Sequence, residues 1–156
     1  MMQKTKYEKV ELQIHKMRPE DIERVIEIEN SSFSCPWSKK SFMYALESDY
    51  SYMITAKSSE KIFGYAGMYS VRGEGYIYNI AVDKYHRKRG IGTLLLSDLI
   101  RYSKESKLSF LSLEVRESNV SAIDLYLKLG FINQGVRKKF YDKPTENAVI
   151  MTIFLS

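Results

Sequence analysis

The order of apolar and polar positions along the chain predicts a protein built from both strands and helices. Apolar side chains at alternating positions, or in short unbroken runs, favour strands, whereas apolar positions three and four residues apart favour helices. These patterns predict strands at about residues 12–17, 50–57, 62–72, 76–82, 110–116, 131–141 and 148–155. They predict helices at about residues 19–29, 38–48, 90–107 and 119–129. We therefore expect a mixed α/β sheet that carries helices on its faces.

Local signals mark the ends of several of these elements. Ser38 and Ser118 are predicted to cap helix N-termini, because a serine side chain can accept a hydrogen bond from a first-turn N–H. Gly130 is predicted to end the last helix, since glycine readily takes the left-handed conformation found there. The strand at residues 76–82 is almost entirely apolar or aromatic, so we expect it to be buried on both faces. In the strand at residues 110–116, Glu114 is predicted to point away from the apolar face that Leu113 carries.

The composition is that of an ordinary folded protein. The chain has 156 residues, of which 44% are hydrophobic and 28% are charged, which excludes a disordered or collagen-like chain. We predict a single domain over residues 1–156, with a core at about 12–155 and a loose segment at 1–9. No apolar run reaches the roughly 20 residues that span a bilayer, and the first residues do not resemble a secretory signal. The one cysteine, Cys35, fits a reducing compartment, so we expect a cytoplasmic protein with no membrane partner.

The net charge leaves two kinds of partner open. Lysine and arginine exceed aspartate and glutamate by 24 to 19, which gives a formal charge of +5. A basic protein can bind nucleic acid through a surface stripe of positive side chains, or it can bind a polyanionic small molecule. The densest basic cluster spans residues 84–89 and runs directly into glycines instead of forming a stripe. This distribution favours a small polyanion, and we expect no nucleic-acid partner.

A basic turn with two glycines follows the strand at residues 76–82 and opens the helix at residues 90–107. Glycines let backbone N–H groups approach an anion closely, and a helix N-terminus adds positive charge, so the turn is predicted to bind phosphate. Its spacing differs from the phosphate-binding loop of nucleoside triphosphatases and from the dinucleotide fingerprint. A solvated basic turn is the alternative. The predicted phosphate site consists of Arg87, Lys88, Arg89, Gly90, Ile91, Gly92 and Thr93.

Five short strings of sequence together resemble a known family. They are the RxxGxG string at 87–92 after the YNIAVD strand at 78–83, CPWS at 35–38, EVRESN at 114–119, AIDLY at 122–126 and LGF at 129–131. The chain resembles the GNAT acetyltransferases, and in particular their RimI branch, over about residues 12–155. The resemblance implies a GNAT fold, in which a mostly antiparallel sheet of six or seven strands carries helices on both faces and splays between the fourth and fifth strands. It also implies transfer of an acetyl group from acetyl-CoA to the N-terminal alanine of small-subunit ribosomal protein eighteen.

The same resemblance implies where acetyl-CoA would bind. Its pantetheine arm would pair with the backbone of Ile80, Ala81 and Val82 as an added strand does. Its pyrophosphate would lie on the amides of the turn at residues 88–93. Asn119 would hold the pantetheine arm, although capping of the following helix is the alternative for this side chain. The two histidines and the lone cysteine have no metal-ligand spacing, so we expect no metal.

Two residues are predicted to carry the proton transfers. By resemblance, Glu114 is the general base that acts through a water, and the alternative is a strand carboxylate paired with Arg116. Tyr126 is the general acid that protonates the departing thiolate and also touches the cofactor, and the alternative is a core tyrosine with a satisfied hydroxyl. A peptide α-amine has a pKa of about 7.7–8.0, against about 10.4 for lysine, so a modest base suffices for a protein N-terminus.

The acceptor side is predicted from aromatic residues in two loops. Pro36 and Trp37, between the first two helices, and Tyr141, near the last turn, are expected to line a peptide groove, and filling of the core is the alternative. Cys35 has no histidine near it in sequence, so we expect a small packed side chain and not a nucleophile. His86 is expected to belong to the solvated basic turn.

Three other functions compete with protein N-terminal acetylation. An acetyltransferase for a small amine such as a polyamine would need an acidic acceptor pocket, and Glu47, Asp49 and Glu74 do not form an acidic cluster in the sequence. A noncatalytic CoA-binding module would be expected to lack Glu114 or Tyr126, and both are present. A nucleic-acid binder would need the basic stripe that the sequence does not show. The sequence leaves the oligomeric state open.

Overall fold

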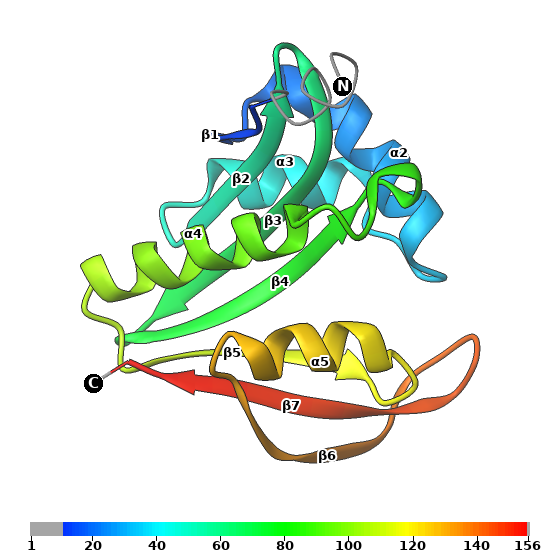
Figure 1. Ribbon diagram of the computed structural model, residues 1–156, viewed down its shortest axis with the longest axis vertical. Coiled ribbons are helices and arrows are strands. Elements are labelled where there is room, and N and C mark those ends of the chain that lie inside the picture. The colour runs from blue at the N-terminus through cyan, green and yellow to red at the C-terminus, as the bar shows by residue number, and fades with distance from the viewer. Residues whose placement is uncertain (1–10, 156) are drawn as a thin grey trace, which may run out of the picture.

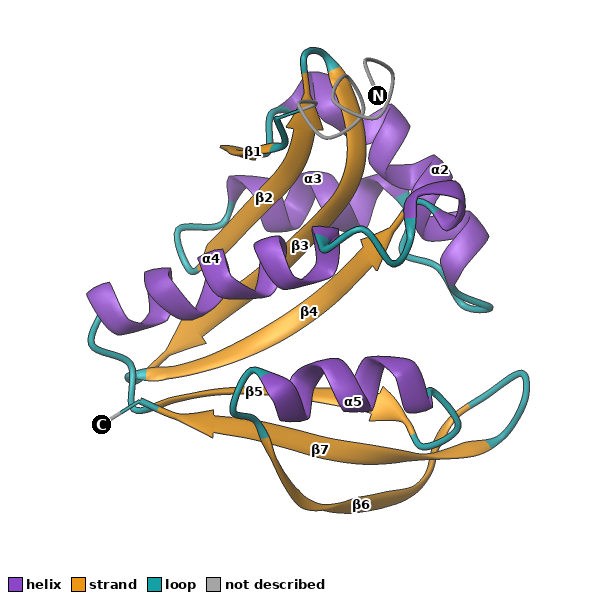
Figure 2. Ribbon diagram, viewed as in Figure 1, coloured by secondary structure: helices purple, strands orange, loops and turns teal. Residues whose placement is uncertain are grey.

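The protein forms one seven-stranded sheet in the order β1-β2-β3-β4-β5-β7-β6 (Figures 1 and 2). The computed structural model describes residues 11–155, so the segment at 1–9, which is predicted to be loose, lies outside the described residues. All neighbouring strands are antiparallel except β4 and β5, which are parallel. The strands are β1 (Gln13–Lys16), β2 (Ser51–Ser58), β3 (Lys61–Val71), β4 (Glu74–Val82), β5 (Phe110–Arg116), β6 (Ile132–Tyr141) and β7 (Glu146–Phe154).

Helices cover both faces of the sheet, as predicted. The helical elements are η1 (Pro19–Asp21), α2 (Ile22–Ser32), α3 (Lys39–Glu47), η2 (Lys84–His86), α4 (Ile91–Glu105) and α5 (Val120–Lys128). One buried cluster joins α2 and α3 to the sheet and is centred on Ile28, Phe42 and Tyr65. A second cluster joins α4 and α5 to the opposite face through Leu95, Leu99 and other apolar side chains. The alternation of apolar side chains along the central strands supplies both clusters with residues.

The sheet is split between its two parallel strands. Only residues 74–76 of β4 pair with residues 110–112 of β5, and the two strands diverge from there, as Figure 1 shows. A register shift in β4 places Ile77 opposite Met68 and Asn79 opposite Gly67, which leaves Tyr78 as an extra residue. Such a bulge bends a strand and redirects its side chains. The prediction that this strand is buried on both faces is wrong, because most of its side chains border the gap and are only half-buried.

The predicted helix caps are confirmed in one case and corrected in the other. Ser38 accepts a hydrogen bond from the Ser41 N–H at 3.2 Å and caps α3. Ser118 is not the cap of α5, because Asn119 takes that position and accepts from the Ala122 N–H at 3.3 Å. The helix therefore starts one residue later than predicted. None of the helices within residues 11–155 combines the length and the apolar character needed to cross a membrane.

Candidate active site

Two adjoining cavities occupy the gap between β4 and β5. The first has a volume of about 490 Å³ and extends from β5 to the loop between α2 and α3. The second, of about 460 Å³, extends from the gap to the N-terminus of α4. The residues that line both cavities are Ser32, Phe33, Ile80, Asn119, Ala122 and Tyr126. Because they share these walls, the two cavities form one channel through the split sheet. We call the first the acceptor cavity and the second the cofactor cavity.

The basic turn forms the outer wall of the cofactor cavity. Gly90 precedes α4 with a φ of 80°, and a Cβ atom added there would have no neighbour within 4 Å. The turn therefore needs glycine for its backbone conformation and leaves open space in front of the helix N-terminus. The Arg87 Nε donates to the Val82 carbonyl at 3.3 Å. All the residues of the predicted phosphate site except Arg89 line the cavity.

His86 also lines the cofactor cavity, and its ring is less exposed to solvent than predicted. The ring is half-buried and lies on Phe63, with 4.4 Å between ring centroids. Its Nδ1 lies 3.6 Å from the Asp83 Oδ1. Burial disfavours the ionised form of Asp83, but the Tyr85 N–H and the charge of Arg24 outweigh burial and lower the pKa of this carboxyl. His86 therefore lies in the exposed basic turn as predicted, but its ring is packed beside a carboxylate and is not solvated like its neighbours.

The backbone of β4 presents polar groups to the gap at alternate residues. The Asp83 N–H donates to the Phe63 carbonyl on β3 at 2.8 Å. Because successive residues of a strand point their backbone groups to opposite sides, the backbone groups of Val82 and Ile80 point toward the gap. Ala81 lies opposite Tyr65 of β3, so its backbone groups point away from the gap. Of the three predicted backbone partners, Ile80 and Val82 can therefore pair with a ligand.

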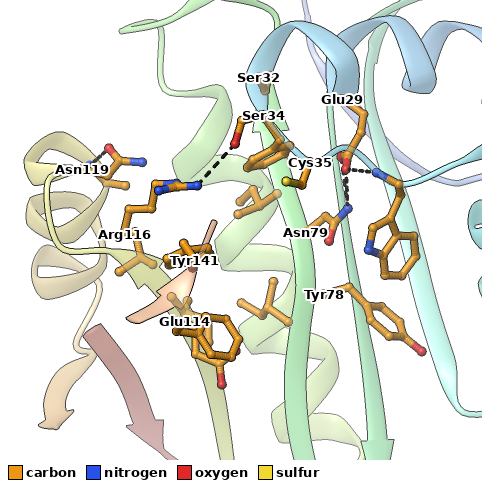
Figure 3. A pocket seen from close by; sticks show the side chains of 18 of the residues that line it. Glu29, Ser32, Ser34, Cys35, Tyr78, Asn79, Glu114, Arg116, Asn119 and Tyr141 are labelled. Atoms are coloured by element: carbon orange, nitrogen blue, oxygen red, sulfur yellow. Dashed lines mark hydrogen bonds between the residues drawn. The ribbon is translucent and has the colours of Figure 1, made fainter. Parts of the chain in front are cut away.

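Glu114 lies on β5 at the wall of the acceptor cavity (Figure 3). Its side chain is 36% exposed and lies 3.3 Å from the Arg137 Nε on β6. The alternative pairing with Arg116 is not found, because Arg116 pairs with Glu146 instead, at 3.1 Å. The sequence could not predict the Arg137 partner, since it depends on the register between β6 and β7. A water-accessible carboxylate beside the cavity can accept a proton through a water molecule.

Tyr126 lies on α5 where the two cavities meet. Its side chain is buried, and its ring packs against Phe131 with 5.7 Å between centroids. Burial, with a smaller contribution from nearby Tyr141, raises the pKa of this phenol. The hydroxyl therefore stays protonated at neutral pH, so it can donate a proton or a hydrogen bond into the channel. Tyr126 belongs to the buried core cluster and also borders both cavities, so its role as the acid stays a prediction.

Asn119 caps α5 as the alternative predicted, and its contact with the pantetheine arm stays a prediction. Its side-chain oxygen caps α5, and the residue also lines both cavities. The amide oxygen is therefore used for the helix, whereas the side chain as a whole borders the channel (Figure 3). A carboxamide has a second polar group, its N–H₂, with which it can donate to a ligand.

The acceptor cavity has aromatic walls from two loops. Trp37 lines it from the loop between α2 and α3 and packs on Tyr78, with 5.0 Å between ring centroids. Tyr141 lines it from the end of β6, and burial, together with the charge of Glu114, raises the pKa of Tyr141 to about 12. Pro36 is exposed and is not among the described residues that line either cavity. Two of the three predicted acceptor residues thus meet at one cavity.

Cys35 also lies at the acceptor cavity, in the loop between α2 and α3. Its side chain is exposed, so the prediction of a small packed residue is wrong. The apolar character of cysteine favours burial, but this loop runs over the surface beside the cavity mouth. The cysteine is therefore a wall residue of the cavity and not a part of the core.

Arg116 connects the two aromatic loops across the cavity. Its Nη2 donates to the Ser34 Oγ at 3.3 Å (Figure 3) and to the Asp142 carbonyl at 2.7 Å. Its Nη1 donates to the Pro144 carbonyl at 2.9 Å, and its guanidinium lies 4.5 Å from the centre of the Tyr141 ring. The side chain therefore holds the turn between β6 and β7 close to the loop between α2 and α3.

Glu29 is a residue of the acceptor cavity that the sequence analysis missed. It lies on α2, lines the cavity and is 2% exposed. Its carboxylate accepts hydrogen bonds from the Trp37 N–H at 2.9 Å, from the Asn79 side chain at 3.0 Å and from the Tyr65 hydroxyl. The sequence signal was weak, since Glu29 sits on the apolar side of a helix where its spacing simply continues the helical period. A carboxylate at an apolar position is the signal that could have found it.

The channel as a whole can bind an anion at one end and place an amine near two proton-transfer groups at the other. The cofactor cavity offers the N-terminus of α4 and basic side chains. The acceptor cavity offers a carboxylate, a protonated phenol and aromatic walls. Between them, an unpaired strand edge can receive an extended, amide-bearing chain.

Comparison with known proteins agrees with this geometry. The model of the acetyltransferase (GNAT) family matches residues 22–131. A protein of Bacillus subtilis is 37% identical over 149 residues, which cover 95% of this chain and 99% of that protein. The ribosomal protein bS18-alanine N-acetyltransferase of Haemophilus influenzae is 38% identical over 138 residues, which cover 86% of this chain and 93% of that enzyme.

A solved structure extends the similarity to the whole fold. The crystal structure of the ribosomal-protein-S18-alanine N-acetyltransferase from Escherichia coli superposes with a TM-score of 0.87 and 30% sequence identity. The superposition covers 94% of this chain and 95% of that structure. The split seven-stranded sheet is thus shared over nearly the full length of both proteins.

Proposed function

Because the chain belongs to the acetyltransferase (GNAT) family, we propose that it transfers the acetyl group of acetyl-CoA to a protein N-terminus, and that the acceptor is the N-terminal alanine of ribosomal protein bS18. The observation that carries this proposal is the channel through the split sheet, which is lined by the N-terminus of α4 in the cofactor cavity, by Glu114 in the acceptor cavity and by Tyr126 where the two cavities meet. The choice of acceptor is supported by the activity for which the similar proteins from Haemophilus influenzae and Escherichia coli are named.

The residues of the cofactor cavity fit acetyl-CoA. Open space in front of Gly90 admits a pyrophosphate group, and the helix N-terminus and Arg87 offset its charge. The Ile80 backbone groups and the Val82 N–H point toward the gap and can pair with the amides of a pantetheine arm, whereas the Val82 carbonyl already accepts from Arg87. When bound, acetyl-CoA supplies an activated acetyl group with a thiol as leaving group. The chain's own residues then orient the donor and manage the protons.

Glu114 and Tyr126 divide the proton transfers between them. Glu114 accepts the proton that the attacking amine loses, through a water in the open part of the acceptor cavity. Tyr126 keeps its proton at neutral pH because burial raises its pKa, so it can donate that proton to the departing sulfur. The position of Tyr126 at the junction of the cavities supports this role, because the thioester and the attacking amine would meet there.

The acceptor cavity favours a peptide N-terminus over a polyamine. Its aromatic side chains, Trp37 and Tyr141, suit the apolar surface of a peptide. The three acidic side chains that line it do not form a cation site, since Glu29 already accepts neutral donors, Glu114 pairs with Arg137 and Asp142 is exposed. A lysine or polyamine amine would also need about 2.5 pKa units more help from the base than an α-amine, roughly 3.4 kcal/mol.

Release of free thiol from acetyl-CoA tests the proposal directly. The purified protein is mixed with acetyl-CoA and an alanine-starting peptide that carries the N-terminal sequence of bS18. The same peptide with a blocked α-amine and spermidine are run in parallel. Turnover with the free-amine peptide alone is the expected result. Turnover with spermidine alone would move the function to small amines, and acetyl-CoA binding without any turnover would favour a noncatalytic module.

The place of the reaction follows from the proposed substrate. A ribosomal protein is available where ribosomes are made, so we propose that the reaction takes place in the cytoplasm. The exposed free thiol of Cys35 is consistent with a reducing compartment.

A further inference from the structure

The carboxylate of Glu29 connects four parts of the molecule at the inner wall of the acceptor cavity. It projects from α2 and accepts from the Trp37 N–H and from the Asn79 side chain on β4 (Figure 3). It also accepts from the Tyr65 hydroxyl on β3. Burial and the charge of Glu29 raise the pKa of Tyr65, so this phenol stays protonated and donates. The partners of Glu29 in the described chain are therefore neutral donors.

The bond to Trp37 anchors the loop that forms one wall of the cavity. Residues 33–38 connect α2 to α3, and Phe33, Ser34, Cys35 and Trp37 of this loop line the cavity. Among these four, Trp37 is the residue whose backbone N–H is held by the Glu29 carboxylate, at 2.9 Å. Its ring packs against the rings of Phe42 and Tyr78, with 5.3 Å and 5.0 Å between ring centroids. The same carboxylate also holds Asn79, the neighbour of Tyr78 on β4.

We propose that Glu29 is a positioning residue that sets how well the acceptor peptide fits, by fixing Trp37 as a rigid wall through a hydrogen bond to its backbone. The proposal rests on the proposed function for the identity of the acceptor. Glu29 acts as an acceptor of neutral N–H and O–H groups and not as a seat for the incoming ammonium, since its oxygens already accept the Trp37, Asn79 and Tyr65 donors. The cofactor cavity does not include Glu29, so acetyl-CoA binding should not depend on it.

Two substitutions separate the hydrogen bond from the charge. Glu29→Leu has a similar size but leaves the Trp37 N–H without an acceptor. Glu29→Gln removes the charge but keeps an oxygen for the Trp37 N–H and the Asn79 side chain, while its N–H₂ can donate to the Tyr65 hydroxyl, which can rotate to accept. The matched control is Asp98→Leu on α4, since Asp98 also accepts from a tyrosine hydroxyl, that of Tyr52 at 2.7 Å, but lines neither cavity.

Steady-state kinetics and the fluorescence of Trp37 are the two readouts. Trp37 is the one tryptophan of the chain, so its emission reports on this loop alone. We expect Glu29→Leu to raise the peptide KM about tenfold, as loss of a buried hydrogen-bond acceptor does, to leave the acetyl-CoA KM unchanged and to shift the Trp37 emission to longer wavelength. We expect Glu29→Gln and Asp98→Leu to keep the peptide KM, the acetyl-CoA KM and the Trp37 emission of the parent.

An unchanged peptide KM or an unchanged Trp37 emission in Glu29→Leu would overturn the proposal. A loss in Glu29→Gln as large as in Glu29→Leu would overturn it too, because the charge and not the hydrogen bond would then matter. If Glu29→Leu does not fold, Glu29→Asp, whose carboxylate is one methylene shorter, is expected to raise the peptide KM and shift the emission in the same direction. Lack of turnover by the parent would refute the proposed function, whereas the Trp37 emission still tests the anchoring of the loop.

Discussion

Replacement of Tyr126 with phenylalanine removes one hydroxyl from the junction of the two cavities and leaves the ring in place. The ring contact with Phe131, at 5.7 Å between centroids, does not involve that hydroxyl. Burial is the largest cause of the raised pKa of Tyr126, and no hydrogen bond to a described residue contributes to it. We therefore expect the variant to keep its fold and its melting temperature, and to bind acetyl-CoA as the parent does.

The expected effect lies in the chemical step. An ordinary phenol has a pKa of about 10 and a thiol about 8.5, so proton transfer from a free phenol to a thiolate is uphill by roughly 2 kcal/mol. The raised pKa of Tyr126 increases this difference, so the proton must move while the bond to sulfur breaks. General acids of this kind contribute about 10²–10⁴-fold to the rate. We expect kcat of Tyr126→Phe to fall by that factor, equivalent to about 3–5 kcal/mol in the barrier.

Single-turnover measurements of thiol release are the appropriate assay, since they separate chemistry from product release. They are run at saturating acetyl-CoA and peptide, together with the acetyl-CoA KM and a thermal melt of the same sample. A parent-like rate of the chemical step in a folded Tyr126→Phe variant would refute the reasoning and mean that another group protonates the sulfur. A rise in the acetyl-CoA KM with an unchanged rate would instead make Tyr126 a binding residue.

Three further predictions concern the base, the phosphate turn and a buried ion pair. Glu114→Gln is expected to lower kcat about 100-fold at pH 7. The difference in kcat from the parent should narrow above about pH 8, because the peptide α-amine then loses its proton without a base. A difference in kcat that does not change with pH would argue against Glu114 as the base. Gly90→Ala is expected to raise the acetyl-CoA KM several-fold, because alanine at a φ of 80° costs about 1–2 kcal/mol and the strain falls on the phosphate turn. Gly73→Ala is the control, since Gly73 has a φ of 79° and equally open surroundings. It should lower the stability of the fold and leave the acetyl-CoA KM unchanged. Burial opposes ionisation of Asp21, but Lys57 and the Arg18 N–H outweigh it and lower its pKa from 3.8. The Asp21–Lys57 pair therefore stabilises the fold above about pH 4, and this stabilisation is lost as the pH falls through the lowered pKa of Asp21. Asp21→Asn should lower the free energy of unfolding in urea by about 3–5 kcal/mol at pH 7. An equal loss at pH 2 would contradict this assignment.

The elements that follow from local pattern were predictable from the sequence. The glycine turn before α4, the Ser38 cap of α3 and the orientation of Glu114 away from Leu113 all depend on neighbours within a few residues. The resemblance supplied the split of the sheet and the grouping of Glu114 with Tyr126, which lie on different elements.

The features that were missed depend on pairing between distant segments. The Arg137 partner of Glu114 is set by the register of β6 on β7. The donors to Glu29 come from residues up to 50 positions away, such as Asn79. The half-burial of β4 follows from the early end of its pairing with β5, which an apolar sequence cannot reveal. The packing of the His86 ring could not be predicted, because its partner Phe63 lies on β3, on the far side of the β3–β4 hairpin.

The split between β4 and β5 also bears on how the protein avoids association with other chains. Each strand edge along the gap carries backbone groups without a partner on the other strand, and such edges are templates for aggregation. The pairs at residues 74–76 and 110–112 fix one end of the gap, so the two edges diverge from a common origin. A sheet keeps its strands about 4.8 Å apart along their whole length, so no single foreign strand can pair with both edges at once. A foreign strand that entered the gap would therefore form a ladder with one edge only and would gain half of the backbone hydrogen bonds that an inserted central strand makes.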